Sequence, residues 1–146
     1  MTPLTAHELL LIGATPDSPL PAGGLEFTGT LCSGSGSASS WTDLFNPFFA
    51  KRFRLTFING SLNLRLDGPI EWQSPQQFEI GGRNWEFCPL ILADVATGLA
   101  FRGNRDRPDL LEVASPVLLR ERLGNPADGT RIPLRLLAGT ILRPAA

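Results

Sequence analysis

Two stretches of this 146-residue chain combine residue types that suit phosphate and metal chemistry. In residues 29–36 a predicted strand runs into a glycine–serine loop, where Gly34 and Gly36 allow successive backbone N–H groups to converge on an anion. In a later strand Ser61 and Asn63 are two residues apart and therefore share one face. A hydroxyl and an amide oxygen can bind Mg²⁺, which takes its other ligands from water and phosphate groups. The two stretches together predict phosphoryl transfer.

Each stretch also has a purely structural interpretation, in which it binds no ligand. A glycine–serine tract is typical of flexible surface loops, and this one lacks the lysine of a P-loop. Alternating polar and apolar residues are the usual pattern of a half-buried antiparallel strand. The single histidine, His7, excludes a histidine-based triad and a zinc site with several imidazole ligands.

A third segment, residues 111–123, predicts a helix end that suits an anion. Ser115 is a suitable N-cap, Pro116 suits the first helical position and Gly124 suits the stop, so we expect a helix over residues 116–123. Its first turn would offer unpaired N–H groups and a positive dipole to an anion or a base edge.

Two charged residues accompany this predicted helix. Glu112 precedes it and is a candidate hydrogen-bond acceptor for a ligand. Arg120 lies one turn inside the helix and is a candidate ligand contact. The alternative is that Arg120 and Arg122 are ordinary solvated charges.

Composition limits the class of protein. Hydrophobic residues make up 42% and charged residues 18%, which predicts one globular domain and excludes disorder. The net charge of −1 argues against a nucleic-acid partner. Cys32 and Cys88 are widely spaced without a metal-binding pattern, so we expect two reduced core residues.

The N-terminal segment is predicted to be an extension of the domain. Thr5 and Glu8 fit a capping box and predict a short helix over residues 6–12. Residues 1–24 are then a helix and linker, and residues 25–146 a single β-barrel domain. The start lacks a basic region and a membrane-spanning length, so we expect neither a signal peptide nor a membrane segment, and a cytoplasmic location.

From residue 25 onward the chain is mostly divided into strand-sized units. Strands are expected at residues 25–32, 61–66, 78–80, 84–87, 90–95, 99–102, 131–137 and 140–142. Turns are expected at Gly81 with Gly82 and at Thr97 with Gly98. A helix over residues 43–53 should break or kink at Pro47. This pattern predicts a mainly β protein, a small barrel with one or two short helices.

Read in order, these motifs resemble those of the archaeal CTP-dependent riboflavin kinase family. The family's G-x-V-x-S-G-x-G-x-G is similar to residues 29–38, its P-x-x-G-T-L-N-V-x-L to residues 57–66, and its E-I-I-A-P-x-x-L-R to residues 112–120. The family's L-x-D-G-D-x-V is similar to the segment around Asp128. The resemblance covers roughly residues 25–137 and implies a six-stranded cradle-loop barrel.

The resemblance also implies site residues. Its nucleotide-binding positions fall on Gly34, Ser35, Gly36, Ser37, Ala38, Ser39, Val117, Leu118, Leu119 and Arg120. Its Mg²⁺ ligands fall on Ser61 and Asn63, and its flavin-contacting glutamate on Glu112, which would be the catalytic residue. Glu112 and Asp106 would contact the acceptor.

The chain departs from the family pattern in several places. Ser37 and Ala38 replace an acidic residue and a glycine, and Phe57 replaces a proline. In the family's R-P-x-R-T-x-H segment, Asp106 stands at the threonine and Pro108 at the histidine. The nucleotide side is therefore closer to the family than the acceptor side.

The implied function is transfer of the γ-phosphate of CTP to riboflavin, which gives FMN and requires Mg²⁺. The partners would then be small molecules. Two alternatives are a kinase of the same fold with another small-molecule acceptor, and a non-catalytic nucleotide- or flavin-binding module. A DNA-binding regulator is a third class, which the net charge of −1 disfavours.

Overall fold

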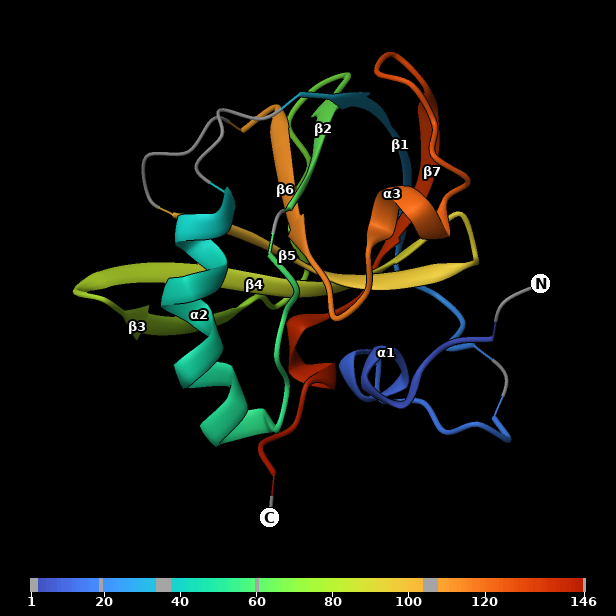
Figure 1. The fold of residues 1–146 in the computed structure, drawn as a ribbon. Coiled ribbons are helices and arrows are strands. Elements are labelled where there is room, and N and C mark those ends of the chain that lie inside the picture. The colour runs from blue at the N-terminus through green and yellow to red at the C-terminus, as the bar shows by residue number, and fades with distance from the viewer. Residues whose placement is uncertain (1–2, 19, 34–37, 60, 104–107, 146) are drawn as a thin grey trace.

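The computed structural model describes residues 3–18, 20–33, 38–59, 61–103 and 108–145 (Figure 1). The strands within these ranges are β1 (Leu25–Cys32), β2 (Leu62–Leu66), β3 (Gln76–Ile80), β4 (Arg83–Leu92), β5 (Ala96–Gly103), β6 (Leu110–Ala114) and β7 (Arg131–Leu136). The helices are α1 (Ala6–Leu11), α2 (Ala38–Phe53), α3 (Leu119–Arg122) and the 3₁₀ helix η1 (Gly139–Ile141).

Six of these strands close into an antiparallel barrel. Their order around the ring is β4, β5, β6, β2, β1 and β7, and β7 pairs back to β4 (Figure 1). β3 lies outside the ring and extends the sheet from β4. The prediction of a mainly β protein built on a six-stranded barrel is confirmed. Among the residues described, no helix has the length and apolar character needed to cross a membrane.

The barrel interior is filled mostly by aliphatic side chains, which we call the leucine cluster. Leu62, Leu64 and Leu66 of β2 belong to it and are at most 6% exposed, as their alternation predicted. Leu119 of α3 packs into the same cluster. α3 is therefore anchored to the barrel interior.

A second set of buried side chains, the aromatic cluster, lies between α2 and the outer face of β4 and β5. The ring of Phe45 is edge-on to those of Phe49, Trp85, Phe87 and Phe101, at centroid distances of 5.0–6.3 Å. Such pairs stabilise packing beyond the area that they bury. The cluster fixes α2 against the outside of the barrel.

α2 is longer than predicted and runs through Pro47. Proline lacks the N–H that would bond the carbonyl one turn earlier, which is why a break was expected. Phe45 and Phe49 on either side of Pro47 are both 0% exposed. Their burial offsets the lost hydrogen bond, so the predicted break is wrong, whereas the alternative of a kink at Pro47 stays a prediction.

The hairpin predicted at Gly81 and Gly82 is confirmed. β3 and β4 pair from Ile80 and Arg83 onward, and the two glycines have φ values of 62° and 78°. A two-residue turn with positive φ at both positions matches the twist of the flanking strands.

The turn predicted at Thr97 and Gly98 is wrong, because both residues lie inside β5. The chain reverses over residues 93–95 instead, where Ala93 has a φ of 49°. Gly98 has a packing role: a Cβ there would lie 2.4 Å from Cγ1 of Val113 in β6. Glycine therefore lets β5 and β6 approach closely.

Two further expectations differ from the structure. Residues 140–142, expected to be a strand, lie mostly in the 3₁₀ helix η1. β6 is not among the predicted strands, yet it pairs with both β2 and β5 and completes the ring. In sequence this segment directly precedes the helix expected over residues 116–123.

α1 begins at the predicted capping box. Thr5 Oγ1 accepts from the Glu8 backbone N–H at 3.1 Å, and Glu8 Oε1 accepts from the Thr5 N–H at 3.0 Å. Leu11 and Ile12 at its end belong to the aromatic cluster. The division into residues 1–24 and 25–146 stays a prediction, but this helix and the barrel share one core.

Candidate functional site

One end of the barrel brings several of the sequence motifs together. A pocket of about 160 Å³ lies between the start of β2, the end of β6 and α3. Its lining includes five of the predicted site residues, Ser61, Val117, Leu118, Leu119 and Arg120. Ser61, one of the two predicted metal ligands, and the predicted second nucleotide segment therefore line the same pocket.

The Ser61 hydroxyl is buried in this region. Its Oγ has no hydrogen-bond partner among the residues that the structure describes. Leaving a buried hydroxyl unpaired costs about 1–3 kcal/mol. An unpaired polar atom in a pocket points to a ligand atom that completes it.

The helix expected over residues 116–123 starts later and is shorter. α3 has four residues, and its N-cap Leu118 makes no side-chain cap hydrogen bond. Ser115 Oγ donates to the Thr97 carbonyl at 2.8 Å and accepts from the Val117 N–H at 3.2 Å. The predicted N-cap is therefore wrong, because Ser115 joins β5 to this segment instead. The segment contributes side chains to the pocket, and we assign it no helix-dipole site.

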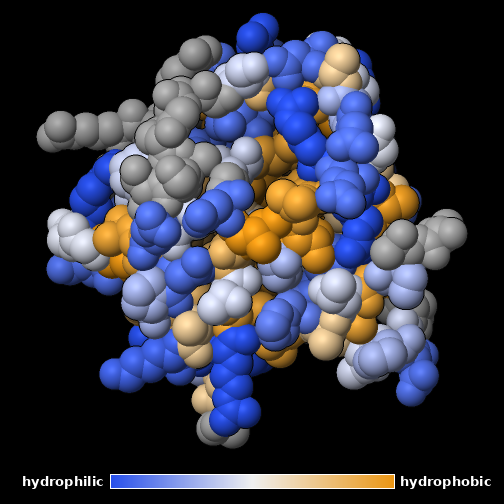
Figure 2. Space-filling view, viewed as in Figure 1, coloured by the Kyte–Doolittle hydropathy of each residue, from blue (hydrophilic) through white to orange (hydrophobic). Residues whose placement is uncertain are grey.

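Leu118 gives the pocket an apolar, accessible wall. It is 58% exposed, and Figure 2 shows apolar surface at the centre of this face, where α3 and the loop before it lie in Figure 1. A second pocket of about 500 Å³ is lined by Leu118, Glu121 and Arg122, among others. Apolar surface beside arginines suits a ligand that has both a flat ring and negative charge.

Arg120 is held beside the pocket by Asp128. Arg120 Nη2 lies 2.8 Å from Asp128 Oδ1, and Ser33 Oγ donates to Asp128 Oδ2 at 2.5 Å. The hydrogen bonds from Ser33 and Arg120 hold the pKa of Asp128 below its usual value. Arg120 is therefore a partly exposed cation in a fixed position, joined to the residue that precedes the glycine–serine loop.

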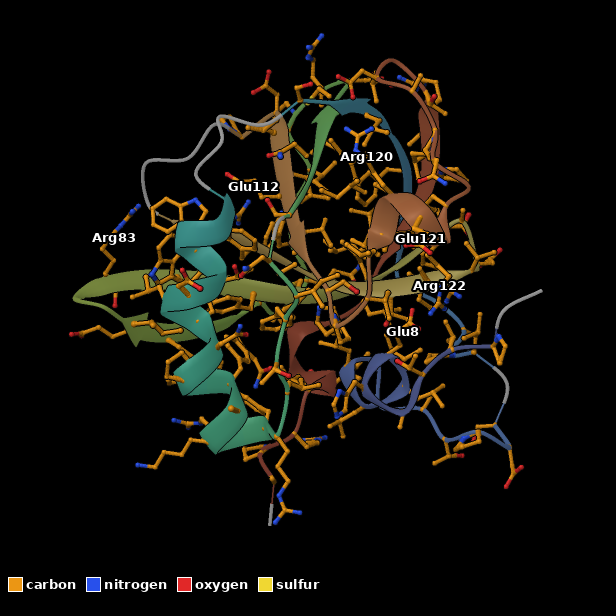
Figure 3. The ribbon with its side chains drawn as sticks, in the orientation of Figure 1. Glu8, Arg83, Glu112, Arg120, Glu121 and Arg122 are labelled. Carbon is orange, nitrogen blue, oxygen red and sulfur yellow. The ribbon has the colours of Figure 1, made fainter. Side chains whose placement is uncertain are left out.

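Asn63 and Glu112 lie on the outer face of the barrel and do not line this pocket. Asn63 in β2 is directly opposite Glu112 in β6, and Glu112 is directly opposite Phe101 in β5. Directly opposed residues have Cβ atoms about 4.5–5.5 Å apart, so the amide and the carboxylate are neighbours. Figure 3 shows Glu112 on β6 and Arg120 on α3 as separate side chains that do not point toward one another.

Two side chains of α2 fix the chain that leads to Ser61. Asn46 Nδ2 donates to the Phe57 carbonyl at 2.9 Å, and Asn46 Oδ1 accepts from the Phe57 N–H at 2.7 Å. Thr42 Oγ1 donates to Asn59 Oδ1 at 3.3 Å. Sequence reasoning missed these positioning residues, because the partners are 11 and 17 residues apart and no local motif links them.

Part of the predicted site lies outside the described residues. These positions are Gly34, Ser35, Gly36, Ser37 and Asp106. For Ala38 and Ser39 the structure describes the backbone, which forms the first turn of α2. Their roles stay predictions.

The two predicted metal ligands are of a type that can hold a metal ion together with a phosphate ligand, although only Ser61 lines the pocket. No group of three or more His, Cys, Asp or Glu side chains that could hold a metal occurs in the described part of the chain. Ser61 and Asn63 offer neutral oxygens, and the Ser61 hydroxyl lacks a partner within the described residues. Mg²⁺ accepts such a small set when phosphate oxygens and water supply the remaining ligands.

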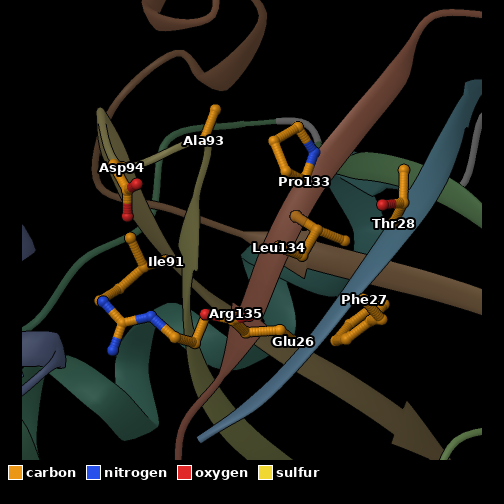
Figure 4. Close-up of a pocket in the computed structure, with 9 residues that line it drawn as sticks. All are labelled: Glu26, Phe27, Thr28, Ile91, Ala93, Asp94, Pro133, Leu134 and Arg135. Atoms are coloured by element: carbon orange, nitrogen blue, oxygen red, sulfur yellow. The ribbon is translucent and has the colours of Figure 1, made fainter. Parts of the chain in front are cut away.

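A larger pocket elsewhere contains none of the predicted site residues. It has a volume of about 440 Å³ and lies on the outer face of β1, β4 and β7 (Figure 4). Its Arg135 donates to the Pro21 and Gly23 carbonyls. The Arg135 guanidinium is thus hydrogen-bonded to the segment before β1, and we assign no ligand to this pocket.

The candidate site therefore has two parts. One is the pocket around Ser61 and α3, and the other is the pair formed by Asn63 and Glu112. Both parts meet at β2, because Ser61 precedes that strand and Asn63 lies within it. No protein-family model and no curated protein matches this chain.

Proposed function

We propose that this protein is a Mg²⁺-dependent kinase of the CTP-dependent riboflavin kinase type, which transfers the γ-phosphate of CTP to riboflavin and gives FMN. One observation carries the proposal: Ser61 and residues 117–120, two motifs distant in sequence, line one pocket. The resemblance predicts metal contact at the first motif and nucleotide contact at the second. Their meeting supports a common nucleotide site.

CTP would be bound on the α3 side of the site. The pocket of about 160 Å³ admits a base or a sugar but is smaller than a typical site for a whole small-molecule ligand. The exposed face of Leu118 would contact a flat ring. Arg120, fixed by Asp128, would pair with phosphate oxygens.

Mg²⁺ would be held by the Ser61 hydroxyl and the Asn63 amide oxygen. When bound, the ion neutralises the negative charge of the β- and γ-phosphates. The unpartnered state of Ser61 Oγ among the described residues supports this role. In a kinase of this type the protein mainly supplies positioning, so a site without histidine or lysine is chemically sufficient.

Glu112 would orient the acceptor hydroxyl and take its proton. In the reaction the hydroxyl oxygen forms a bond to the γ-phosphorus, and the bond from that phosphorus to the bridging oxygen of CDP breaks. The hydroxyl proton passes to the carboxylate. The position of Glu112 directly opposite Asn63 supports a common role in transfer.

The acceptor side leaves two alternatives. Asp106 stands where the family has a threonine, so a different small-molecule hydroxyl could replace riboflavin. A non-catalytic module would bind CTP or flavin without transfer. The cytoplasmic location expected from the sequence belongs to the same proposal.

The test is to incubate the full chain with CTP, Mg²⁺ and riboflavin and to quantify FMN and CDP by chromatography. Asn63→Ala should reduce turnover by about 100-fold or more, because it removes a metal ligand. Asn84→Ala, the same substitution at an exposed position of β4, is the matched control and should retain activity.

Undiminished turnover in folded Asn63→Ala would contradict the metal assignment. If the wild-type protein binds CTP but forms no FMN, a screen of other hydroxyl acceptors separates the two alternatives. Transfer to another acceptor would identify a kinase of different specificity, and no transfer would favour the binding module.

A further inference from the structure

Glu8 is a buried carboxylate that the proposed chemistry does not use. It is 0% exposed, although it belongs to the capping box of a six-residue helix. Besides its capping bond, its Oε1 lies 2.8 Å from Arg122 Nη1, and its Oε2 accepts from the Thr97 N–H at 3.1 Å. A capping box needs neither contact, and a buried charge is costly unless it is paired and hydrogen-bonded.

These contacts reach both ends of residues 115–122, the segment that lines the candidate pocket. At one end Glu8 pairs with Arg122 of α3. At the other end Thr97, which also donates its hydroxyl to the Glu8 carbonyl at 2.9 Å, accepts from the Ser115 hydroxyl at 2.8 Å. α1 is therefore connected to the start and the end of this segment.

α3 depends on such external contacts for its position. A helix of four residues without a side-chain cap does not hold its shape alone. Two ion pairs join α3 to other described residues: Arg122–Glu8 is largely buried, with side chains 12% and 0% exposed, whereas Arg120–Asp128 is 45% and 48% exposed. Breaking a buried pair has the greater effect. Figure 3 shows Glu8, Arg122 and Arg120 following one another from α1 to α3.

We propose that Glu8 is a positioning residue through which α1 holds residues 115–122 in the arrangement that the candidate pocket requires. The effect on nucleotide affinity rests on the proposed function, whereas the contact between α1 and α3 belongs to the fold. Loss of the Glu8 charge should therefore loosen Leu119 and Arg120 and weaken nucleotide binding without direct contact to the nucleotide.

The first experiment measures amide hydrogen exchange in the full chain, wild type against Glu8→Gln, which keeps size and polarity but removes the charge. Amides of residues 122–125, which donate to carbonyls of the preceding turn, should exchange at least about tenfold faster. Asp67→Asn is the matched control. It removes a carboxylate from a pair with Arg131 that is also 2.8 Å long but exposed, so it should leave α3 unchanged.

Arg122→Met breaks the same pair from the α3 side and serves as the second variant. Wild-type exchange rates at α3 in either folded variant, or faster exchange spread evenly over the barrel, would overturn the proposal. Failure of both variants to fold, with Asp67→Asn folded, would also overturn it, since Glu8 would then serve folding as a whole.

The second measurement is the dissociation constant for CTP with Mg²⁺. In variants with loosened α3 it should rise by about tenfold, because less of the protein is in the binding arrangement. An unchanged constant would overturn the positioning role. A wild-type protein that binds no CTP would contradict the proposed function, while the exchange data would still decide whether α1 holds α3.

Discussion

The two parts of the candidate site are supported by different sets of buried side chains. Leu119 of α3 packs into the leucine cluster inside the barrel. Phe101, the β5 neighbour of Glu112, belongs to the aromatic cluster outside it. α3 thus depends on the barrel interior, whereas the packing of α2 supports the Asn63–Glu112 pair and, through Asn46 and Thr42, the chain that leads to Ser61. α3 and the Asn63–Glu112 pair should each respond mainly to changes in their own cluster.

Among the changes that test this separate support, replacement of Phe45 by alanine should have the largest effect on stability. The side chain is 0% exposed and contacts four other aromatic rings, so its loss should cost about 3–5 kcal/mol of unfolding free energy. Urea denaturation measures the loss. Hydrogen exchange should show α2 opening more than α3. Equal loss of protection in the two helices would contradict separate support.

Replacement of Leu119 by alanine should have a smaller effect on the other part. The side chain is 6% exposed, and its loss should cost about 2–3 kcal/mol. Because α3 lines the pocket, the KM for CTP should rise while kcat at saturating CTP changes little. Leu10→Ala, at a leucine that is 41% exposed, is the control and should change neither constant. A fall in kcat with an unchanged KM would contradict the assignment of α3 to nucleotide binding.

Lowering the pH should have the smallest effect on stability. It should act on the part of the site that contains α3. Hydrogen bonds from Ser33 and Arg120 lower the pKa of Asp128 in the folded protein. The charged carboxylate is therefore favoured by folding, and its contribution is present above the usual carboxyl pKa of about 4 and is lost as pH falls through the folded-state value. Urea denaturation across this range should show the difference between wild type and Asp128→Asn shrinking as pH falls. A constant difference would contradict this role of Asp128.

The two cysteines do not form a disulfide that would link the two parts of the site. Cys32 and Cys88 are both free, and Cys88 is buried as expected, whereas Cys32 is only half-buried and the prediction that it is a core residue is wrong. Burial raises the pKa of the Cys88 thiol to about 12, so this side chain is unreactive near neutral pH. Cys88 belongs to the leucine cluster, whereas Cys32 is half-buried beside Asn63.

Features with strong local signals were predictable from the sequence. The capping box at Thr5 and Glu8 and the turn at Gly81 and Gly82 were placed correctly, because neighbouring residues determine them. The bounds of β1 were also correct. In the site, the family resemblance implied that Ser61 and residues 117–120 belong to one site, and they line one pocket.

Features that depend on contacts between distant residues were not predictable. Gly98 has a turn-like residue type, but it is needed where Val113 of another strand approaches. Serine is a common N-cap residue, but the Ser115 hydroxyl donates to the Thr97 carbonyl instead. The pairing of Glu8 with Arg122 joins residues near opposite ends of the chain, and each looks like an ordinary surface charge in sequence.

The most direct test of a cytidine-nucleotide site is thermal unfolding of the full chain with CTP, ATP, GTP or UTP, each with Mg²⁺. Binding to the folded state stabilises it by about 2.7 kcal/mol when the ligand is at 100 times its dissociation constant, which shifts the Tm by several degrees. We expect CTP to raise the Tm more than the other three nucleotides. An unchanged Tm with all four would contradict the proposed nucleotide site.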